Sequence, residues 1–264
     1  MKLAVEGVGA WGPGFDTWPQ LRERLQQGAS GELPPAGSPK PALIPARELR
    51  RAPLLVRLAI EVAAQACEDA DIDPAQTLSI FASGMADMSI TDYMCRTLAA
   101  GHRQLSPTKF HNSVHNAASG YWSISTGCHA AANSVAGFRE TVPAALLEAA
   151  ALCAENSQPV LLVAFDVPGP QPVNLTHVDQ AFGAALVLRA GDAKRNITLD
   201  IAQQAGQWPT LRSTALQPLY ETNPSARLLA VLEALAGLAP ANLALPLGSG
   251  VALSVQPGAA EQAA

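Results

Sequence analysis

A glycine-rich segment near the start of the chain has the spacing of a nucleotide-binding fingerprint. Gly7–Gly12 is a G-x-G-x-x-G motif that directly follows an apolar strand pattern. In a dinucleotide fold such a turn opens a helix whose N-terminus holds the pyrophosphate. Here Pro13 and Gly14 follow at once, and the expected acidic residue, Glu32, lies in a proline-rich loop. Nucleotide binding is therefore one hypothesis for this segment, beside the simpler interpretation of a glycine turn packed closely against another element.

A cysteine beside a histidine, Cys128-His129, could supply a nucleophile and a base for acyl transfer or thioester hydrolysis. Neighbours in sequence usually point to different faces, so an incidental thiol beside a loop histidine is the simpler interpretation. The other cysteines, Cys67, Cys95 and Cys153, are widely spaced and form no Cys-x-x-Cys pair, which disfavours structural zinc. Reduced thiols are typical of cytosolic proteins, and we expect a cytoplasmic protein.

Four histidines, His102, His111, His115 and His129, gather in the middle third of the sequence. His111 and His115 are four residues apart and could share a helix face, as zinc ligands do. No acidic residue lies between them, so surface or hydrogen-bonded histidines are favoured, and we expect no metal and no cofactor. The sequence contains neither a G-x-S-x-G nucleophile elbow nor a P-loop.

The composition argues against several broad classes of protein. The chain has 264 residues, of which 48% are hydrophobic and 15% charged, and its formal net charge is −5. A disordered protein combines few hydrophobic residues with many charged ones, which is the reverse of this composition. A nucleic-acid binder has a basic patch, and this sequence lacks one. No apolar run is long enough for a transmembrane helix, and Glu6 interrupts the N-terminal apolar segment, unlike in a signal peptide. The length allows one large domain or two small ones, and the low charge suggests a large buried or partner-facing surface.

Strand and helix patterns alternate along the chain, which predicts α/β layers with a mixed sheet. A continuous apolar run predicts a central strand at Pro159–Asp166, and helical spacing of apolar residues predicts a helix at Leu54–Ala70. The other predicted strands are Lys2–Val8, Leu78–Ala82, Ala131–Ala136, Ala181–Arg189, Ile197–Ile201 and a closing hairpin of Leu243–Leu247 with Val251–Val255. The other predicted helices are Trp18–Gln27, Ser89–Ala100, Val114–Ser125, Val142–Glu155 and Ala226–Ala236.

The segment Phe110–Ile124, FHNSVHNAASGYWSI, resembles the helix that precedes the nucleophile in β-ketoacyl synthases, where an asparagine and a small residue–glycine pair recur. Leu3–Gly14 resembles the first synthase strand with its glycine turn, which accounts for the glycine motif. Further segments agree in order: Leu54–Ala70, Leu78–Gly84, Pro159–Asp166 and Phe182–Leu188. The resemblance covers residues 1–190 and implies a thiolase-like, layered αβα fold with a mixed sheet.

The turn at which a synthase carries its acyl-accepting cysteine is altered in this chain. The resemblance places it at Val135–Thr141, just before the predicted helix Val142–Glu155, and it contains no cysteine. Without the thiolate, condensation cannot start by the family's route. After Glu155 the only histidine is His177. It lies in neither of the two motifs that carry the catalytic histidines of the synthase family. The resemblance thus implies no catalytic residues and a degenerate nucleophile elbow at Gly137, Phe138, Arg139 and Glu140.

A synthase-like subunit without nucleophile or histidines resembles a chain-length factor, the inactive partner of an active ketosynthase in type II polyketide systems. The short form most resembles the chain-length-factor-like proteins of aryl polyene clusters. We expect one thiolase-like domain over residues 1–264, with 191–264 as a shortened second half where the two histidines would lie. The resemblance implies a heterodimer with an active ketosynthase. An acyl carrier protein with its acyl chain is a further candidate partner. We expect neither nucleic-acid binding nor membrane insertion.

Large side chains would shape the tunnel for the growing acyl chain in such a subunit. By positional analogy, the candidates for tunnel or interface residues are Met88, Tyr93, Met94, Phe110, Asn116 and Trp122. Ordinary core packing is the alternative interpretation of each. Two other functions stay open: an independent acyltransferase or thioesterase that uses Cys128 or another residue, and nucleotide binding through Gly7–Gly12.

Overall fold

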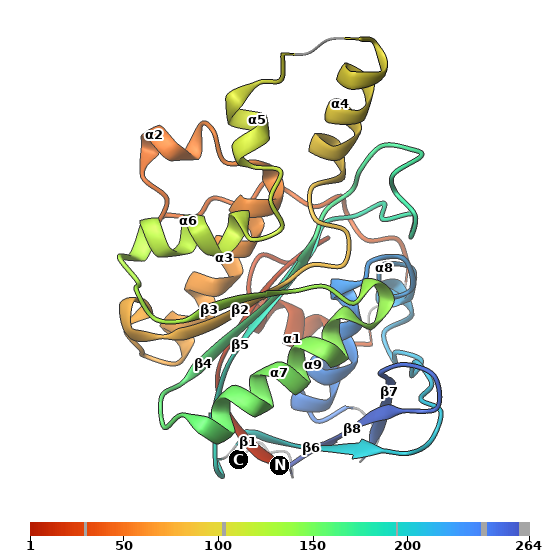
Figure 1. Ribbon diagram of the computed structural model, residues 1–264. Coiled ribbons are helices and arrows are strands. Elements are labelled where there is room, and N and C mark those ends of the chain that lie inside the picture. The colour runs from red at the N-terminus through yellow and green to blue at the C-terminus, as the bar shows by residue number, and fades with distance from the viewer. Residues whose placement is uncertain (29–30, 102–103, 194, 239–241, 259–264) are drawn as a thin grey trace.

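The computed structural model describes residues 1–264 except 29–30, 102–103, 194, 239–241 and 259–264 (Figure 1). Within these residues, eight strands form one mixed sheet in the order β3-β2-β4-β5-β1-β6-β8-β7. Strands β3, β2 and β4 run parallel, and all other neighbouring strands are antiparallel. The strands are β1 (Lys2–Trp11), β2 (Leu78–Ala82), β3 (Ala132–Val135), β4 (Val160–Asp166), β5 (Phe182–Ala190), β6 (Asn196–Ala202), β7 (Leu243–Pro246) and β8 (Ala252–Pro257).

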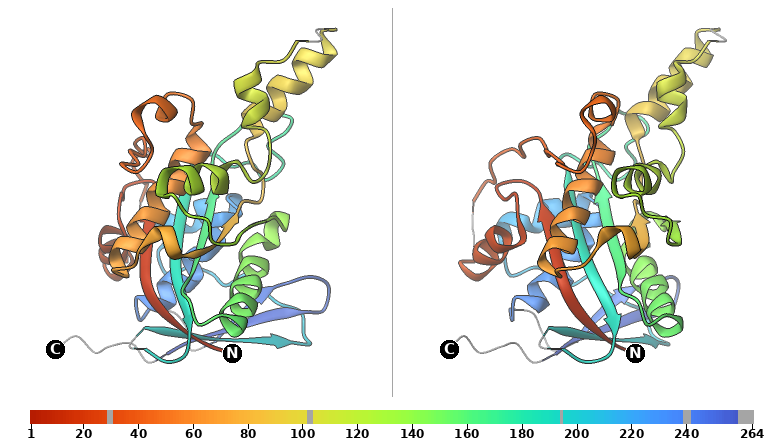
Figure 2. Two further views of the ribbon diagram at one scale, coloured as in Figure 1. Left: turned by 60° about the vertical axis from the view of Figure 1, so that its left-hand side comes forward. Right: turned by 90° about the vertical axis from the view of Figure 1, so that its left-hand side faces the viewer.

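Helices cover both faces of the sheet, which gives the αβα layers that the sequence predicted (Figures 1 and 2). Helices α3 and α6 share one hydrophobic core with the sheet, and α1, α7 and α9 share the other. The helices are α1 (Trp18–Gln26), α2 (Ala46–Leu49), α3 (Leu54–Asp69), α4 (Met88–Ala99), α5 (Pro107–His111), α6 (Ala117–Thr126), α7 (Thr141–Glu155), α8 (Gln217–Thr222) and α9 (Leu229–Leu235).

Strand β4 explains why the sheet is covered on both faces. All of its residues are buried, as the continuous apolar run predicted. Leu162 and Ala164 belong to the core of α7, whereas Leu161 and Val163 belong to the core of α3. Because successive side chains of a strand point to opposite faces, a strand without polar alternation needs a helical layer on each side.

Gly7 and Gly9 of the motif lie inside β1, which continues to Trp11, so the predicted strand end at Val8 is wrong; Gly12 follows in a tight turn that it closes with Phe15. A Cβ on Gly7 would lie 2.1 Å from the carbonyl oxygen of Ala66, and one on Gly9 would lie 2.1 Å from that of Val62. The glycines therefore let α3 approach the backbone of β1. A nucleotide fingerprint requires a turn that opens a helix, but here the first two glycines belong to β1 and α1 begins only at Trp18. This geometry removes the support for nucleotide binding.

Two helix starts and several short helices also differ from the sequence prediction. The helix expected over Val114–Ser125 begins only at Ala117, because the short α5 and a turn precede it. The helix expected to begin at Ala226 starts as a 3-10 turn, Ser225–Leu228, and becomes α-helical at Leu229. Helices α2, α5 and α8 were not predicted, since each is too short to show a helical repeat. The closing β7–β8 hairpin is confirmed.

Helices α4 and α5 form an arm that projects from the body of the molecule (Figure 2). Asp87 begins α4, because its carboxylate accepts a hydrogen bond from the amide of Ile90 at 3.0 Å. Tyr93 joins the two helices: its hydroxyl accepts from the amide of Ser106 at 3.2 Å, and Lys109 lies 3.6 Å above its ring. In the part of the chain that is described, no helix has the length and apolar character needed to cross a bilayer.

Candidate functional site

A tight turn joins β3 to α7 at residues 136–140, which we call the elbow (Figure 1). Its central residue, Phe138, has a φ of +52°, in the left-handed region that costs a non-glycine residue about 1 kcal/mol. The hydroxyl of Thr141 donates to the carbonyl oxygen of Phe138 at 2.7 Å and accepts from the amide of Gly137 at 3.0 Å. Strand, strained turn and helix thus follow one another where the sequence placed the degenerate elbow.

The end of β2 lies directly against the elbow. A Cβ on Gly84 would be 2.7 Å from the carbonyl oxygen of Phe138 and 2.7 Å from the Cβ of Pro224. Only glycine allows this approach. Residues separated by more than a hundred positions in the sequence therefore meet at one point, where β2, the elbow and the start of the 3-10 turn Ser225–Leu228 are in contact.

A fully buried carboxylate, Asp166 at the end of β4, connects the same segments. One carboxylate oxygen accepts from the Ser83 hydroxyl at 2.7 Å and the Met85 amide at 3.0 Å. The other accepts from the Ser225 hydroxyl at 2.6 Å and the Gly84 amide at 3.1 Å. Burial raises the pKa of Asp166, and the four hydrogen bonds oppose that rise. The carboxylate therefore fixes the ends of β2 and β4 and the 3-10 turn relative to one another.

Two more polar side chains support this network through backbone atoms. The amide group of Asn223 donates to the carbonyl oxygens of Asp166, at 3.2 Å, and of Gln180, at 3.0 Å. The Nε2 atom of His115 lies 3.1 Å from the carbonyl oxygen of Ser83. These contacts hold the loops that surround the elbow, and their role is to position the backbone.

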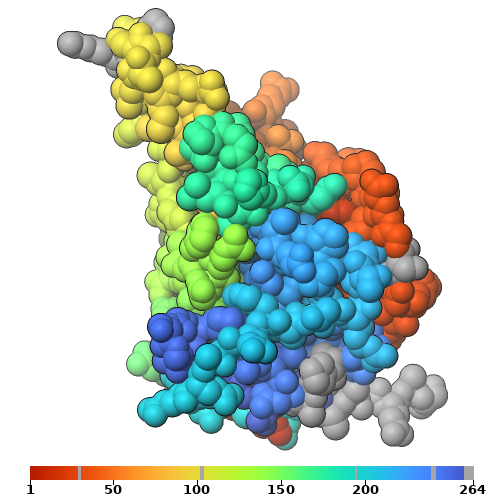
Figure 3. All heavy atoms as spheres, turned by 90° about the vertical axis from the view of Figure 1, so that its right-hand side faces the viewer, coloured from red at the N-terminus to blue at the C-terminus, as the bar shows by residue number. Residues whose placement is uncertain are grey.

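Arg227, in the 3-10 turn beside the elbow, is buried with only 7% of its surface exposed. Its guanidinium carbon lies 4.4 Å from the ring centre of Trp208 and 4.4 Å from that of Tyr220. Desolvation lowers the pKa of Arg227, and the nearby cationic Arg139 of the elbow adds to the effect. Figure 3 shows the green elbow segment beside the blue segment that carries α8 and the 3-10 turn.

The elbow carries no thiol, and the nearest cysteines in the sequence are not placed for nucleophilic attack. Cys153 lies in α7, where burial raises the pKa of its thiol to about 11. Cys128 is buried, and its Sγ donates to the carbonyl oxygen of Thr77 at 3.5 Å. His129 is exposed. A carbonyl cannot act as the base that a cysteine nucleophile needs, so the geometry does not support the Cys128-His129 dyad.

The six tunnel or interface candidates divide into buried and exposed residues. Met88 packs against Gly169, whose added Cβ would lie 2.4 Å from the Met88 Cβ, and the ring of Trp122 lies tilted against that of Phe81 with centres 6.3 Å apart. Both are almost fully buried in the chain. The half-buried Tyr93 and Met94 lie on the arm helix α4, whereas Phe110 on α5 and Asn116 before α6 are exposed. The structure therefore does not bring the six together as one surface.

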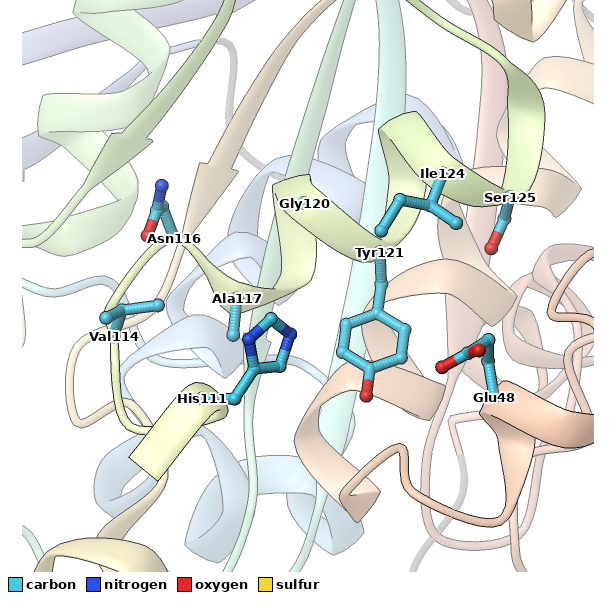
Figure 4. Close-up of a pocket in the computed structure, with 9 residues that line it drawn as sticks. All are labelled: Glu48, His111, Val114, Asn116, Ala117, Gly120, Tyr121, Ile124 and Ser125. Atoms are coloured by element: carbon cyan, nitrogen blue, oxygen red, sulfur yellow. The ribbon is translucent and has the colours of Figure 1, made fainter. Parts of the chain in front are cut away.

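Asn116 lines a cavity of about 190 Å³ next to α6 (Figure 4). The rings of His111 and Tyr121 meet edge to face there, with centres 6.5 Å apart, and Glu48 lies beside Tyr121. Exposed apolar side chains of Val114 and Ile124 complete the lining. The cavity is thus a shallow surface feature with an apolar side and a polar side, away from the elbow.

The two histidines that could have shared a helix face do not share one. His111 is the last residue of α5, whereas His115 lies in the turn before α6 and contacts Ser83. His102 lies outside the described residues. Within the described residues, no three His, Cys, Asp or Glu side chains are gathered as metal ligands would be.

Sequence reasoning missed Asp166, Ser225 and Arg227 as parts of this site. A charged residue at the end of a fully apolar strand was a usable signal for Asp166, because a buried carboxylate requires donors. Ser225 and Arg227 carry no such local signal, since their partners are far away in the sequence.

Comparison with known proteins identifies both a family and a fold. The family described as "Beta-ketoacyl synthase, N-terminal domain" matches residues 18–238. No curated protein is similar enough to this chain to count as a relative.

Several solved structures share the fold. A chain from the complex of the ketosynthase ApeO with its chain length factor ApeC, from Xenorhabdus doucetiae, aligns with a TM-score of 0.72 and 19% identity over 97% of this chain and 99% of that one. The ishigamide ketosynthase/chain length factor aligns with a TM-score of 0.69 and 13% identity over 98% and 100%. A β-ketoacyl synthase from Burkholderia phymatum aligns with a TM-score of 0.62 and 12% identity over 89% and 77%. The thiolase-like fold expected from the sequence is thereby confirmed.

Proposed function

The chain belongs to the β-ketoacyl synthase family, and from that premise we propose that it is a non-catalytic subunit of the chain-length-factor type that pairs with an active ketosynthase. The observation that carries this proposal is the elbow. It has the strand–turn–helix form of a nucleophile elbow and a left-handed central residue, and that residue is Phe138. A phenyl ring cannot accept an acyl group, so condensation would have to take place on the partner.

The surface around α5 and α6 supports an obligate partner. Phe110, Val114 and Ile124 are each more than half exposed, and we call these three side chains the α5–α6 face. Val114 and Ile124 line the same cavity, and Phe110 directly precedes His111 of that lining. Isolated apolar residues are ordinary on a protein surface, but several together are typical of an interaction site. The active ketosynthase is the occupant that the family membership favours.

The edge of the sheet continues this surface. Strand β3 is the last strand at its end of the sheet, and α6 packs against it. The outer edge of β3 pairs with no other strand of the described residues. An exposed strand edge next to exposed apolar side chains is suited to pairing with another chain. In this proposal the active ketosynthase covers both the α5–α6 face and the outer edge of β3.

The pair would extend an acyl chain held on an acyl carrier protein, in polyketide or aryl polyene biosynthesis. The arm helix α4 carries the candidates Tyr93 and Met94, which are half-buried in the isolated chain and available to line a shared tunnel. Met88 and Trp122 are packed in the core and would shape such a tunnel only through the helices they support. Phe110 and Asn116 would lie at the partner interface.

The test is co-expression of this chain with each ketosynthase encoded in the source genome. Pull-down on this chain followed by size-exclusion chromatography should give a stable one-to-one complex with one of them. That complex should elongate a carrier-bound acyl chain, and mutation of the cysteine in the partner should abolish elongation. Elongation by this chain alone, or a folded chain that associates with none of the ketosynthases, would overturn the proposal.

A further inference from the structure

The guanidinium of Arg227 is buried without an acidic partner among the described residues. Its one hydrogen bond within that part of the chain runs from Nη2 to the carbonyl oxygen of Glu221 at 3.2 Å. None of the ion pairs between described residues includes it. The carboxylate of Glu221 is near enough to raise the pKa of Arg227 but forms no ion pair with it, and it accepts a hydrogen bond from the Gln217 amide at 2.8 Å. Most of the N–H donors of Arg227 are therefore unused.

Such an arrangement is costly unless something compensates the charge. An arginine keeps its proton in proteins, so burial cannot be relieved by neutralisation. Trp208 and Tyr220 lie over the guanidinium and provide cation–π attraction, which acts on the faces of the planar group. The donors along its edge receive nothing from these rings. An oxyanion in the plane of the guanidinium would satisfy them.

Two further groups at the same place favour an anion. The Tyr220 hydroxyl is buried beside the Arg227 guanidinium, and in the described part of the chain its O–H has no acceptor, so that it has a donor to offer. Arg139 of the elbow is close enough to lower the pKa of Arg227. The Tyr220 hydroxyl and the Arg227 guanidinium therefore lie together between α8 and the 3-10 turn Ser225–Leu228, and the charge of Arg139 acts on them from the elbow.

We propose that Arg227, with Tyr220 and Arg139, forms a binding site for a carboxylate. A planar carboxylate matches the planar guanidinium held between two rings, because both of its oxygens can accept from the same edge. All the protein groups of the proposed site belong to this chain, so that the isolated chain can be tested for carboxylate binding. The carboxylate can belong to a small molecule or to an acidic side chain of a partner subunit, and these two sources are distinguished by experiment.

The test is a titration of the isolated full-length chain with sodium acetate and with sodium malonate, followed by thermal unfolding at constant ionic strength. A bound ligand raises the Tm in a saturable way, and both carboxylates should do so relative to sodium chloride. Arg227→Gln should weaken the affinity about tenfold or more, as expected when a charge-assisted bidentate pair is lost. Arg22→Gln, which changes an exposed arginine of α1, should leave the affinity unchanged.

Three results would overturn the proposal. These are a carboxylate response equal to that of chloride, an unchanged affinity in Arg227→Gln, and stabilisation by inorganic phosphate without stabilisation by acetate or malonate. If Arg227→Gln does not fold, Tyr220→Phe serves in its place, because it removes only the unpartnered hydroxyl and should weaken carboxylate binding.

Repeating the titration on the complex with a ketosynthase shows whether the carboxylate belongs to a small molecule or to the partner. If the response to acetate persists in the complex, a small molecule is the ligand. If the response disappears only in the complex, an acidic side chain of the partner occupies the site. Absence of any ketosynthase complex would refute the proposed function and leave the result on the isolated chain unaffected.

Discussion

The carbonyl oxygen of Phe138 lies so close to Gly84 that a Cβ on the glycine would approach it to 2.7 Å. The strained elbow thus packs directly on the end of β2, and Pro224 closes the same contact from the other side. This packing explains how an aromatic residue can be held at a φ of +52° without relaxing. The elbow is a rigid feature of the fold, even though the chain has no thiol to present there.

Substitution of Gly84 by alanine should destabilise the chain by about 2 kcal/mol, because neither backbone nor proline can move away from the new Cβ. Urea unfolding measures this change. Gly120→Ala is the matched control: it lies in α6 with nothing within 4 Å of an added Cβ, and it should be neutral or stabilising by up to about 1 kcal/mol. Equal effects of the two substitutions would mean that the elbow does not depend on Gly84.

The backbone strain at Phe138 can be isolated by comparing Phe138→Gly with Phe138→Ala. Both variants lose the ring, but only alanine keeps a Cβ in the left-handed region. The glycine variant should therefore be the more stable by about 1 kcal/mol, measured by chemical denaturation. An alanine variant as stable as the glycine variant would contradict a left-handed backbone at residue 138.

Asp166→Asn should lower the free energy of unfolding at pH 7 by about 2 kcal/mol, since its NH2 group would face a backbone N–H of Gly84 or Met85. The folded-state pKa of Asp166 is raised above its unfolded value. Its contribution to stability is therefore fully present below the unfolded pKa and declines as the pH rises through the folded one. The advantage of the wild type over Asp166→Asn should shrink from about pH 4 upwards.

Urea unfolding of both proteins at a series of pH values measures this difference. Asp179→Asn is the control, because it changes an exposed aspartate between β4 and β5, and it should show a difference near zero at every pH. A wild-type advantage that grows with pH would show that hydrogen bonding outweighs desolvation at Asp166.

Gly9→Ala should destabilise the chain by about 3 kcal/mol, because the new Cβ would lie 2.1 Å from the carbonyl oxygen of Val62 in α3. Gly37→Ala, with open space around the added Cβ, should have little effect. Thermal unfolding compares the two. A titration of the wild type with NADH should give no shift, and saturable NADH binding would restore the nucleotide hypothesis.

Substituting aspartate for an apolar residue of the α5–α6 face should weaken binding to the ketosynthase without destabilising the isolated chain. Phe110→Asp and Ile124→Asp change exposed side chains and should leave the stability of the isolated chain within about 0.5 kcal/mol. Each should weaken binding to the ketosynthase at least about tenfold, because a charge would be buried at the interface. Ile201→Asp, on the exposed side of β6 far along the sheet from β3, is the control and should pair normally. Calorimetry of the pair measures each affinity.

The order of the strands and of the longer helices was determined by the sequence alone, because apolar runs such as Pro159–Asp166 and the periodicity of Leu54–Ala70 are local patterns that survive in the fold. The absence of cysteine from the elbow was equally plain, since it is a matter of residue type at one turn. Family resemblance and fold followed from these features.

The tertiary structure alone decided what the remaining residues do. Gly7 and Gly9 have the spacing of a nucleotide motif, but the approach of α3 uses them as packing positions inside a strand. Ser83, Asp166 and Ser225 form one hydrogen-bonded unit across 142 residues of sequence, from 83 to 225, and no local pattern predicts such a meeting. Contacts at that separation depend on how the sheet orders its strands, which is a property of the whole chain. For the same reason, the unused donors of Arg227 became visible only once its neighbours were in place.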